Sequence, residues 1–201
     1  EGETAAWYPK GEAPVLTQLV EEGLLPPVAE RVGAEPLVLR GVDGPGTYGG
    51  DMYKLRDTGG RRMNPVGLVR WSPQGYPIVP NVAKSWEVSE DGKTYTFHLR
   101  RGMRWSDGAP FTSADVAYWW NAEVLDPRIN PGGPGGEFIH KGVPMVMEAP
   151  DPHTLRCSFV APYALFLERL ASATYWCESP KHFLERFHPT HGDQALIEQV
   201  M

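Results

Sequence analysis

The amino-acid sequence predicts an α+β fold in which a mixed β-sheet is flanked by helices. Three observations support this class: stretches where apolar and polar residues alternate, stretches with apolar residues at helical spacing, and abundant glycine and proline between them. The 201 residues include 22 glycines and 20 prolines, so irregular connections should separate the regular elements. A hydrophobic content of 41% is sufficient for a domain with a substantial core.

The clearest strand signal predicts a β-hairpin over residues 86–99. Residues 86–88 and 94–99 alternate between apolar and polar side chains, and this period of two is typical of half-buried strands. Asp91-Gly92 lies between the two runs and favours the positive backbone angles of a tight turn.

A second turn and a helix are predicted directly after the hairpin. Asp107-Gly108 repeats the turn chemistry. Thr112, followed three positions later by Asp115, is typical of a helix N-terminus, although a capping box proper would carry Glu or Gln there. Residues 116–124 have apolar side chains at helical spacing, and Asp126-Pro127 should end this helix.

The N-terminal third is predicted to contain one helix, one strand and one irregular stretch. Residues 1–33 should form a helical arm with apolar side chains at positions 16, 19, 20 and 24, ended by Pro26-Pro27. Residues 36–42 should form a strand, and the glycine-rich residues 43–66 should be irregular.

The C-terminal third is predicted to contain strands and then helices. The glycine-rich residues 130–136 should form a loop, and residues 143–159 should form strands joined by a turn at 151–153. Residues 164–171 and 180–188 have the spacing of helices.

Residues 86–116 closely resemble the signature block of the family 5 extracytoplasmic solute-binding proteins of ABC importers, which bind peptides, nickel or oligosaccharides. Other stretches resemble one subgroup of this family in the same order along the chain: 13–31, 35–39, 48–50, 67–71, 80–86, 179–184 and 187–189. The likeness therefore extends over nearly the whole chain.

The resemblance implies a two-lobed periplasmic-binding-protein fold of type II, cluster C-like. Because family members are longer, it implies that this chain is the N-terminal portion only, with the second lobe absent. Residues 1–35 would form an N-terminal helical arm. Residues 36–201 would form the first-lobe portion of the solute-binding domain, with the signature hairpin and helix at 82–125.

The resemblance also implies a function outside the cytoplasmic membrane. The chain would belong to the substrate-binding component of an ABC importer that captures an oligosaccharide or an oligopeptide and delivers it to the membrane subunits of the permease. Such a protein is not an enzyme, needs no cofactor, and lies in the periplasm or is lipid-anchored on the outer face of the cytoplasmic membrane.

Aromatic and polar side chains on predicted loops are the candidate ligand contacts. Flat aromatic faces cover sugar rings or apolar side chains, and a few polar groups then fix the orientation of the ligand. These candidates are Tyr175, Trp176, Asn64, Arg62 and Phe138. Tyr175 and Trp176 are preferred, because two adjacent large aromatics beside a turn cannot both face one core.

The two cysteines leave two alternatives open. A disulfide between Cys157 and Cys177 would close a loop of about 20 residues and is possible in an exported protein. Two buried free thiols are equally compatible with the sequence.

Other functional classes have little support. The net charge of −6 argues against binding to nucleic acid. No apolar run approaches the length of a membrane-spanning helix, and histidines 182, 188 and 191 lack the spacing of a zinc site. Two alternatives to transport remain: a glycoside hydrolase-like enzyme that uses the same aromatic platforms, and a stand-alone interaction domain.

Overall fold

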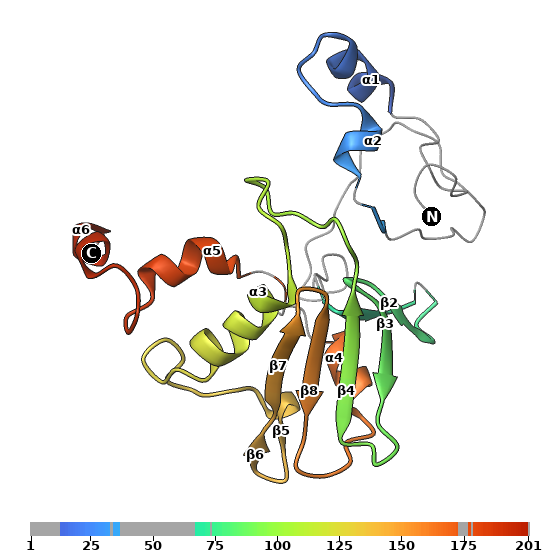
Figure 1. Ribbon diagram of the computed structural model, residues 1–201. Coiled ribbons are helices and arrows are strands. Elements are labelled where there is room, and N and C mark those ends of the chain that lie inside the picture. Colours follow the sequence, from blue (N-terminus) through green and yellow to red (C-terminus); the bar gives the residue numbers. More distant parts are fainter. Residues whose placement is uncertain are drawn as a thin grey trace.

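The centre of the fold is a four-stranded antiparallel sheet (Figure 1). The computed structural model describes residues 13–32, 34–36, 67–72, 74–172, 177 and 179–200. The sheet has the strand order β3-β4-β8-β7 and consists of β3 (Ala83–Val88), β4 (Thr94–Leu99), β7 (Val146–Asp151) and β8 (Thr154–Ser158). The predicted α+β class and the predicted hairpin are confirmed. In place of a mixed sheet, all strand pairs among the described residues are antiparallel.

One face of this sheet forms the core. Along β4 every second residue is buried, and Tyr95 and Phe97 point to the same side. Helix α4 (Phe166–Ser172) covers that side behind the sheet in Figure 1. The ring of Phe166 lies 4.9 Å from that of Tyr95 and 6.5 Å from that of Phe97. The alternation seen in the sequence therefore decides which face α4 covers.

Two short ribbons complete the sheet structure. Strand β1 (Val69–Trp71) pairs with β2 (Ile78–Pro80), and β5 (Ile139–His140) pairs with β6 (Val143–Pro144), both antiparallel. The predicted strands in 143–159 are thus β6, β7 and β8.

Helix α3 (Ser113–Tyr118) begins where the sequence predicts. The Thr112 N–H donates to Asp115 Oδ2 at 2.8 Å, so aspartate completes a capping box in the place of the usual Glu or Gln. The helix continues as a π-helical segment, Trp119–Val124, and ends before Asp126-Pro127. The sequence gives no indication of this wider turn.

The N-terminal helices differ from the single predicted helix. The chain forms α1 (Pro14–Glu21) and α2 (Val28–Arg31), so the first helix ends before Pro26-Pro27. Gly23 has φ +70° and donates to the Val20 carbonyl at 3.0 Å, and the Leu24 N–H donates to the Leu19 carbonyl at 2.9 Å. These two bonds form a Schellman motif, which ends the helix. The predicted strand 36–42 and the irregular stretch 43–66 fall almost wholly outside the described residues.

The C-terminal segment extends away from the sheet on the side of α3 (Figure 1). The predicted helix 180–188 is α5 (Lys181–Leu184) followed by a 3₁₀ turn, Glu185–Phe187, and α6 (Gln194–Val200) lies beyond it. We call residues 179–200 the C-terminal arm. In the described part of the chain, no helix has the length and apolar character needed to span a bilayer.

Asp115 joins the capped helix to the C-terminal arm. While one carboxylate oxygen accepts the Thr112 N–H, the other accepts the Lys181 N–H at 3.0 Å, and the side chain is buried. Asp115→Ala should therefore lower the free energy of unfolding by about 2 kcal/mol, because it removes a cap and leaves a second N–H without its acceptor.

Urea denaturation measures this loss. Asp193→Ala is the matched control: Asp193 Oδ1 accepts the N–H groups of Ala195 and Leu196 at 3.1 and 3.2 Å, but it is exposed. The decrease in the free energy of unfolding caused by Asp193→Ala should stay below about 1 kcal/mol. Equal losses in the two variants would contradict the bridging role of Asp115.

Candidate functional site

Four of the five candidate ligand contacts, Tyr175, Trp176, Asn64 and Arg62, lie outside the described residues. The fifth, Phe138, is only 6% exposed. Its ring packs edge-on against Trp119 at 5.8 Å and Trp120 at 5.4 Å. The structure thus places Phe138 in the core, and ligand contact by any of the five residues stays a prediction.

A cavity of about 840 Å³ lies between the segment after α2 and the connection from β4 to α3. In Figure 1 this connection extends beyond the end of the sheet towards α2. Charged and aromatic side chains that line the cavity include Glu35, Arg100, Arg101, Arg104, Trp105 and Phe111. Cys177 also lines it, and the predicted aromatic pair Tyr175-Trp176 directly precedes Cys177 in the chain.

A tight turn positions two aromatic side chains that line this cavity, Trp105 and Phe111. The Trp105 N–H donates to the Ala109 carbonyl at 2.8 Å, and Gly108 at the reversal has φ +88°. Asp107 Oδ1 accepts the Ala109 N–H at 3.0 Å, as expected for the predicted turn. The Trp105 and Phe111 rings consequently lie 5.4 Å apart with their planes inclined at 58°.

Glu35 lies in the segment after α2, which lines the other side of the cavity, and it binds this segment to the sheet. Lys84 Nζ donates to Glu35 Oε1 at 2.6 Å, and the Arg101 backbone N–H donates to Oε2 at 2.7 Å. Burial would raise the pKa of Glu35, but the hydrogen bonds from Lys84 and Arg101 outweigh it and hold this pKa below its usual value. Both carboxylate oxygens are therefore engaged.

Arg100 links the connection that follows β4 to the segment after α2, on the two sides of the cavity. Its Nε donates to the Asn81 carbonyl at 2.7 Å, and its Nη1 donates to the Pro36 carbonyl at 3.2 Å. Burial lowers the pKa of this guanidinium, and the nearby Glu35 offsets part of the effect. Arg100 is thus a cation held in a partly desolvated position.

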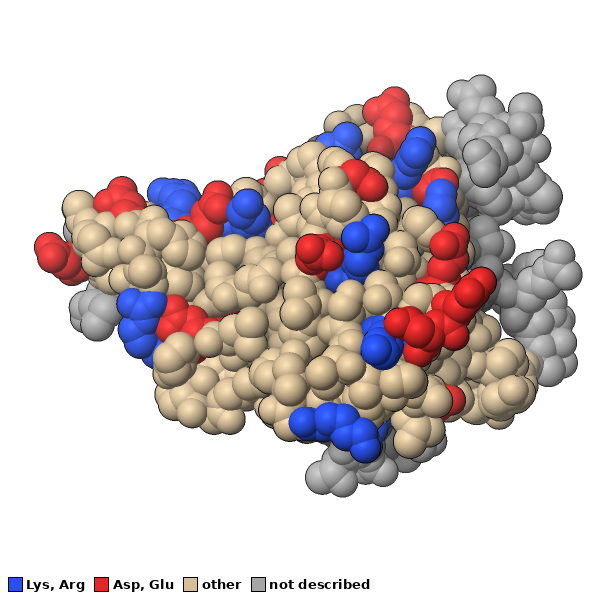
Figure 2. All heavy atoms as spheres, turned by 60° about the horizontal axis from the view of Figure 1, so that its bottom comes forward, with Lys and Arg blue, Asp and Glu red and all other residues tan. Residues whose placement is uncertain are grey.

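The cavity has an excess of positive charge. On the face shown in Figure 2, acidic and basic side chains are interspersed. Among the described cavity residues, in contrast, there are four arginines (31, 100, 101 and 104) and two glutamates (30 and 35). None of these four arginines is among the ligand contacts predicted from the sequence. The available signal is the clustering of Arg100, Arg101 and Arg104 immediately before Trp105, within the stretch that carries the family resemblance.

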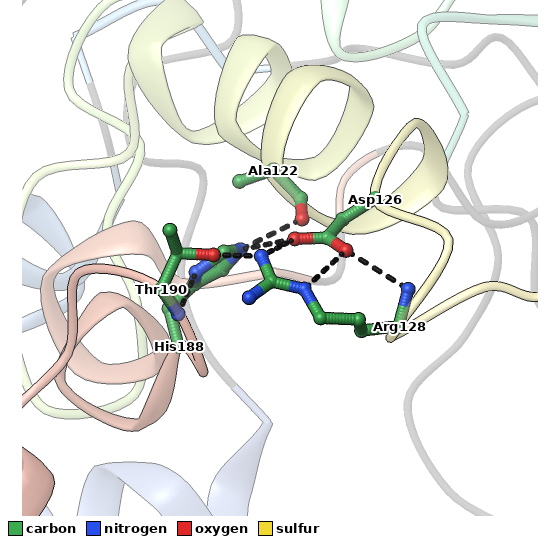
Figure 3. A network of polar contacts seen from close by, with 5 residues as sticks. All are labelled: Ala122, Asp126, Arg128, His188 and Thr190. Atoms are coloured by element: carbon green, nitrogen blue, oxygen red, sulfur yellow. Dashed lines mark hydrogen bonds and ion pairs between the residues drawn. The ribbon is translucent and has the colours of Figure 1, made fainter.

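A second hollow of about 530 Å³ lies between α3 and the C-terminal arm, beside a polar network (Figure 3). His188 Nδ1 accepts the Thr190 N–H at 3.2 Å, so we assign the ring proton to Nε2, which donates to the Ala122 carbonyl at 2.9 Å. Arg128 donates to Asp126 through Nε at 3.1 Å and Nη2 at 2.6 Å, and Nη2 also contacts Thr190 Oγ1. The Arg128 side chain holds the pKa of Asp126 below its usual value. This network fixes the arm to the π-helical segment.

The structure assigns no metal site to the described residues: none of their His, Cys, Asp and Glu side chains form a group of three that could hold an ion. His182 is instead close to Asp107, with 2.6 Å between Nε2 and Oδ2. His188 and His191 stack on each other with ring centres 3.9 Å apart.

Cys157 and Cys177 are both buried and are not joined by a disulfide, which is the second of the two alternatives that the sequence left open. Burial raises the pKa of the Cys157 thiol far above its usual range, which makes it unreactive as a nucleophile. A thiol reagent such as dithionitrobenzoate should therefore leave Cys157 unlabelled in the native chain and label both cysteines in denaturant without reductant. No labelling in denaturant would instead reveal a disulfide.

The comparisons with known proteins agree on one family. Residues 77–193 match the family described as bacterial extracellular solute-binding proteins, family 5 middle. The periplasmic alpha-galactoside-binding protein of Rhizobium meliloti is 32% identical over 92% of this chain and 30% of its own length. The periplasmic oligopeptide-binding protein OppA of Escherichia coli is 32% identical over 60% of this chain and 24% of its own length.

Solved structures give the same result. An oligopeptide-binding protein OppA superposes with a TM-score of 0.80 at 39% identity, over 95% of this chain and 30% of that one. The periplasmic binding protein MelB of Agrobacterium fabrum, in complex with stachyose, superposes with a TM-score of 0.70 at 29% identity, over 92% of this chain and 32% of that one. The chain therefore spans about a third or less of the length of these relatives. It belongs to the bacterial extracellular solute-binding proteins of family 5.

Proposed function

We propose that this chain forms part of the substrate-binding component of an ABC importer. It captures an oligosaccharide or an oligopeptide outside the cytoplasmic membrane and delivers it to the membrane subunits of a permease. The observation that carries this proposal is the similarity over more than nine-tenths of the chain to two binding proteins of known structure, one named for oligopeptides and one bound to stachyose.

The cavity provides suitable chemistry for such a ligand. Trp105 and Phe111 offer aromatic faces, and arginine side chains offer hydrogen-bond donors. Apolar faces with a few directed polar groups are typical of sites that bind small molecules without reacting with them. The glycoside hydrolase and the stand-alone interaction domain are not favoured, since the relatives are named as binding proteins.

The predicted contacts Tyr175, Trp176, Arg62 and Asn64 stay part of this proposal as predictions from the sequence. Tyr175 and Trp176 precede the cavity residue Cys177, and Arg62 and Asn64 precede β1 in the chain. A second lobe would close over the bound solute, as in the hinge motion of two-lobed binding proteins. The periplasm, or a lipid anchor on the outer face of the cytoplasmic membrane, is the location that suits this role.

Thermal unfolding in the presence of ligand candidates tests the proposal. The chain is heated alone, with millimolar stachyose or raffinose, and with di- to pentapeptides, with glucose at matched mass concentration as the solvent control. A ligand that binds only the folded chain stabilises it, by about 2.7 kcal/mol at a hundredfold excess over its Kd. A raised Tm with one ligand class supports the proposal, whereas no shift together with consumption of a glycan would favour the hydrolase.

A further inference from the structure

The C-terminal arm, residues 179–200, is attached to the rest of the chain by polar contacts and not through the core. Among the described residues, the hydrophobic core cluster includes no side chain of this arm. The hollow of about 530 Å³ lies between the arm and α3. Two of the attachments depend on His182 and His188, and histidine is the side chain whose charge ordinarily changes between pH 5 and 8.

The outer part of the arm is held by a histidine that has to be neutral. His188 is 4% exposed, and its Nδ1 accepts the Thr190 N–H at 3.2 Å while its Nε2 donates to the Ala122 carbonyl at 2.9 Å. A proton on Nδ1 would turn this acceptor into a donor that faces a second donor. The same turn brings Thr190 Oγ1 to Arg128, so the turn and this contact both need the neutral ring.

A second histidine adds to the effect of a proton. His191 is exposed and stacks on His188, with ring centres 3.9 Å apart and planes inclined at 18°. Two neutral rings can pack in this way, whereas two protonated rings would hold like charges in contact. Acid therefore opposes both the turn at Thr190 and the stack beside it.

The charges around the two rings do not cancel this effect. The ionisable side chains that face the rings, or line the hollow and the arm beside them, are Tyr118, Glu123, Asp126, Arg128, Lys181 and Glu185. Asp126 Oδ2 lies 3.7 Å from His188 Nε2 and would favour a protonated ring, but Arg128 Nη2 already donates to this oxygen at 2.6 Å.

The inner end of the arm, in contrast, tolerates acid. Burial raises the pKa of Glu123, whose Oε2 accepts a hydrogen bond from Ser179 Oγ at 2.8 Å. A protonated Glu123 is cheaper to bury, so its contribution favours attachment at low pH and is lost as the pH rises.

The contact between His182 and Asp107 likewise survives mild acid. His182 Nε2 lies 2.6 Å from Asp107 Oδ2, and this pair gains a charge when His182 takes up a proton. The hydrogen bond from His182 holds the pKa of Asp107 below its usual value, so the contribution of this carboxylate is present between pH 5 and 8 and is lost only in stronger acid.

From these opposite requirements, we infer that the C-terminal arm is an acid-sensitive element. Below about pH 6.5 its outer part, residues 188–200, leaves the π-helical segment while α5 stays attached. Release would uncover the face of α3 that lines the hollow, with Ala114, Ala117 and Tyr118. This inference goes beyond the proposed function and holds whichever solute the chain captures.

Hydrogen exchange at pH 7.5 and pH 5.5 tests the inference, with rates expressed as protection factors so that the intrinsic effect of pH on exchange cancels. A histidine that takes up its proton only in the released arm, near pH 6.5, shifts the equilibrium about tenfold over this interval. The protection of residues 192–197 should therefore fall about tenfold at pH 5.5, while that of residues 181–187 and of strand β4 should change less than about twofold.

The variant His188→Asn links this fall to one ring. Asparagine carries an oxygen that can accept the Thr190 N–H but has no ring nitrogen to protonate, so protection at residues 192–197 should no longer depend on pH. His98→Gln is the matched control, because it replaces a histidine on the sheet beside Glu87 and should keep the tenfold fall. Unchanged protection of β4 shows that each variant folds.

An NMR titration of the unaltered chain provides a second measurement that needs no variant. The ring signals of His188 should titrate with the same midpoint as the amide signals of residues 192–197. Different midpoints, an equal fall in His188→Asn, a fall that includes α5, or no fall in the unaltered chain would each overturn the inference. None of these outcomes bears on solute capture, so the proposed function is tested separately.

Discussion

Trp120→Ala is expected to lower the free energy of unfolding by about 3–5 kcal/mol, the range for truncating a buried tryptophan. Trp120 is fully buried in the π-helical segment. Its ring lies 6.0 Å from Trp119 and 5.4 Å from Phe138. Removing it leaves a cavity between the segment after α3 and the turn that carries Phe138, and close packing on both sides limits collapse into that space.

Urea denaturation followed by circular dichroism measures this effect. Leu165→Ala is the control, since Leu165 is 57% exposed and its truncation should cost less than about 1 kcal/mol. A loss below about 1.5 kcal/mol for Trp120→Ala would contradict the packing of Trp120 and Phe138 in the core.

His188→Ala is expected to cost about 2 kcal/mol and to loosen the C-terminal arm. The imidazole is buried and satisfies the Ala122 carbonyl and the Thr190 N–H at once. Its removal leaves both groups without their partner, and each such group costs about 1–3 kcal/mol where water cannot replace the bond. Because Thr190 is exposed, water can replace the bond to its N–H. The expected loss of unfolding free energy is therefore nearer the lower end of the sum of the two penalties.

Hydrogen exchange locates this effect. Amides in the C-terminal arm should exchange faster in His188→Ala, while those of strand β4 should exchange as in the unaltered chain. His191→Ala is the matched variant, because His191 stacks on His188 but is exposed. Equal acceleration in the two variants would mean that stacking, and not the buried hydrogen bonds, holds the arm.

The local structure of the signature region could be predicted from the sequence because its determinants are close together in the chain. Asp91-Gly92 and the alternation of residues 94–99 are sufficient for the hairpin, and Thr112 with Asp115 is sufficient for the helix start. The end of α1 is also encoded locally, at Gly23, although the more conspicuous Pro26-Pro27 predicts a later end.

The site was less predictable because its contacts join distant positions. Glu35 meets Lys84 across 49 positions and the Arg101 N–H across 66, so no local pattern marks the cavity. Phe138 follows a glycine-rich loop, which favours a surface position, yet long-range packing against the π-helical segment buries it. The preference for π over α geometry at residues 119–124 likewise has no local signal in the sequence.

The proposed capture of a solute without chemical change is tested most directly by equilibrium dialysis with recovery of the ligand. The chain is dialysed against a mixture of oligosaccharides and oligopeptides. The retained molecules are then released by denaturing the chain, and their molecular masses are determined by mass spectrometry. We expect saturable retention of one class, with every recovered molecule at its original mass. Retention of neither class, or recovery of cleaved products, would contradict the claim.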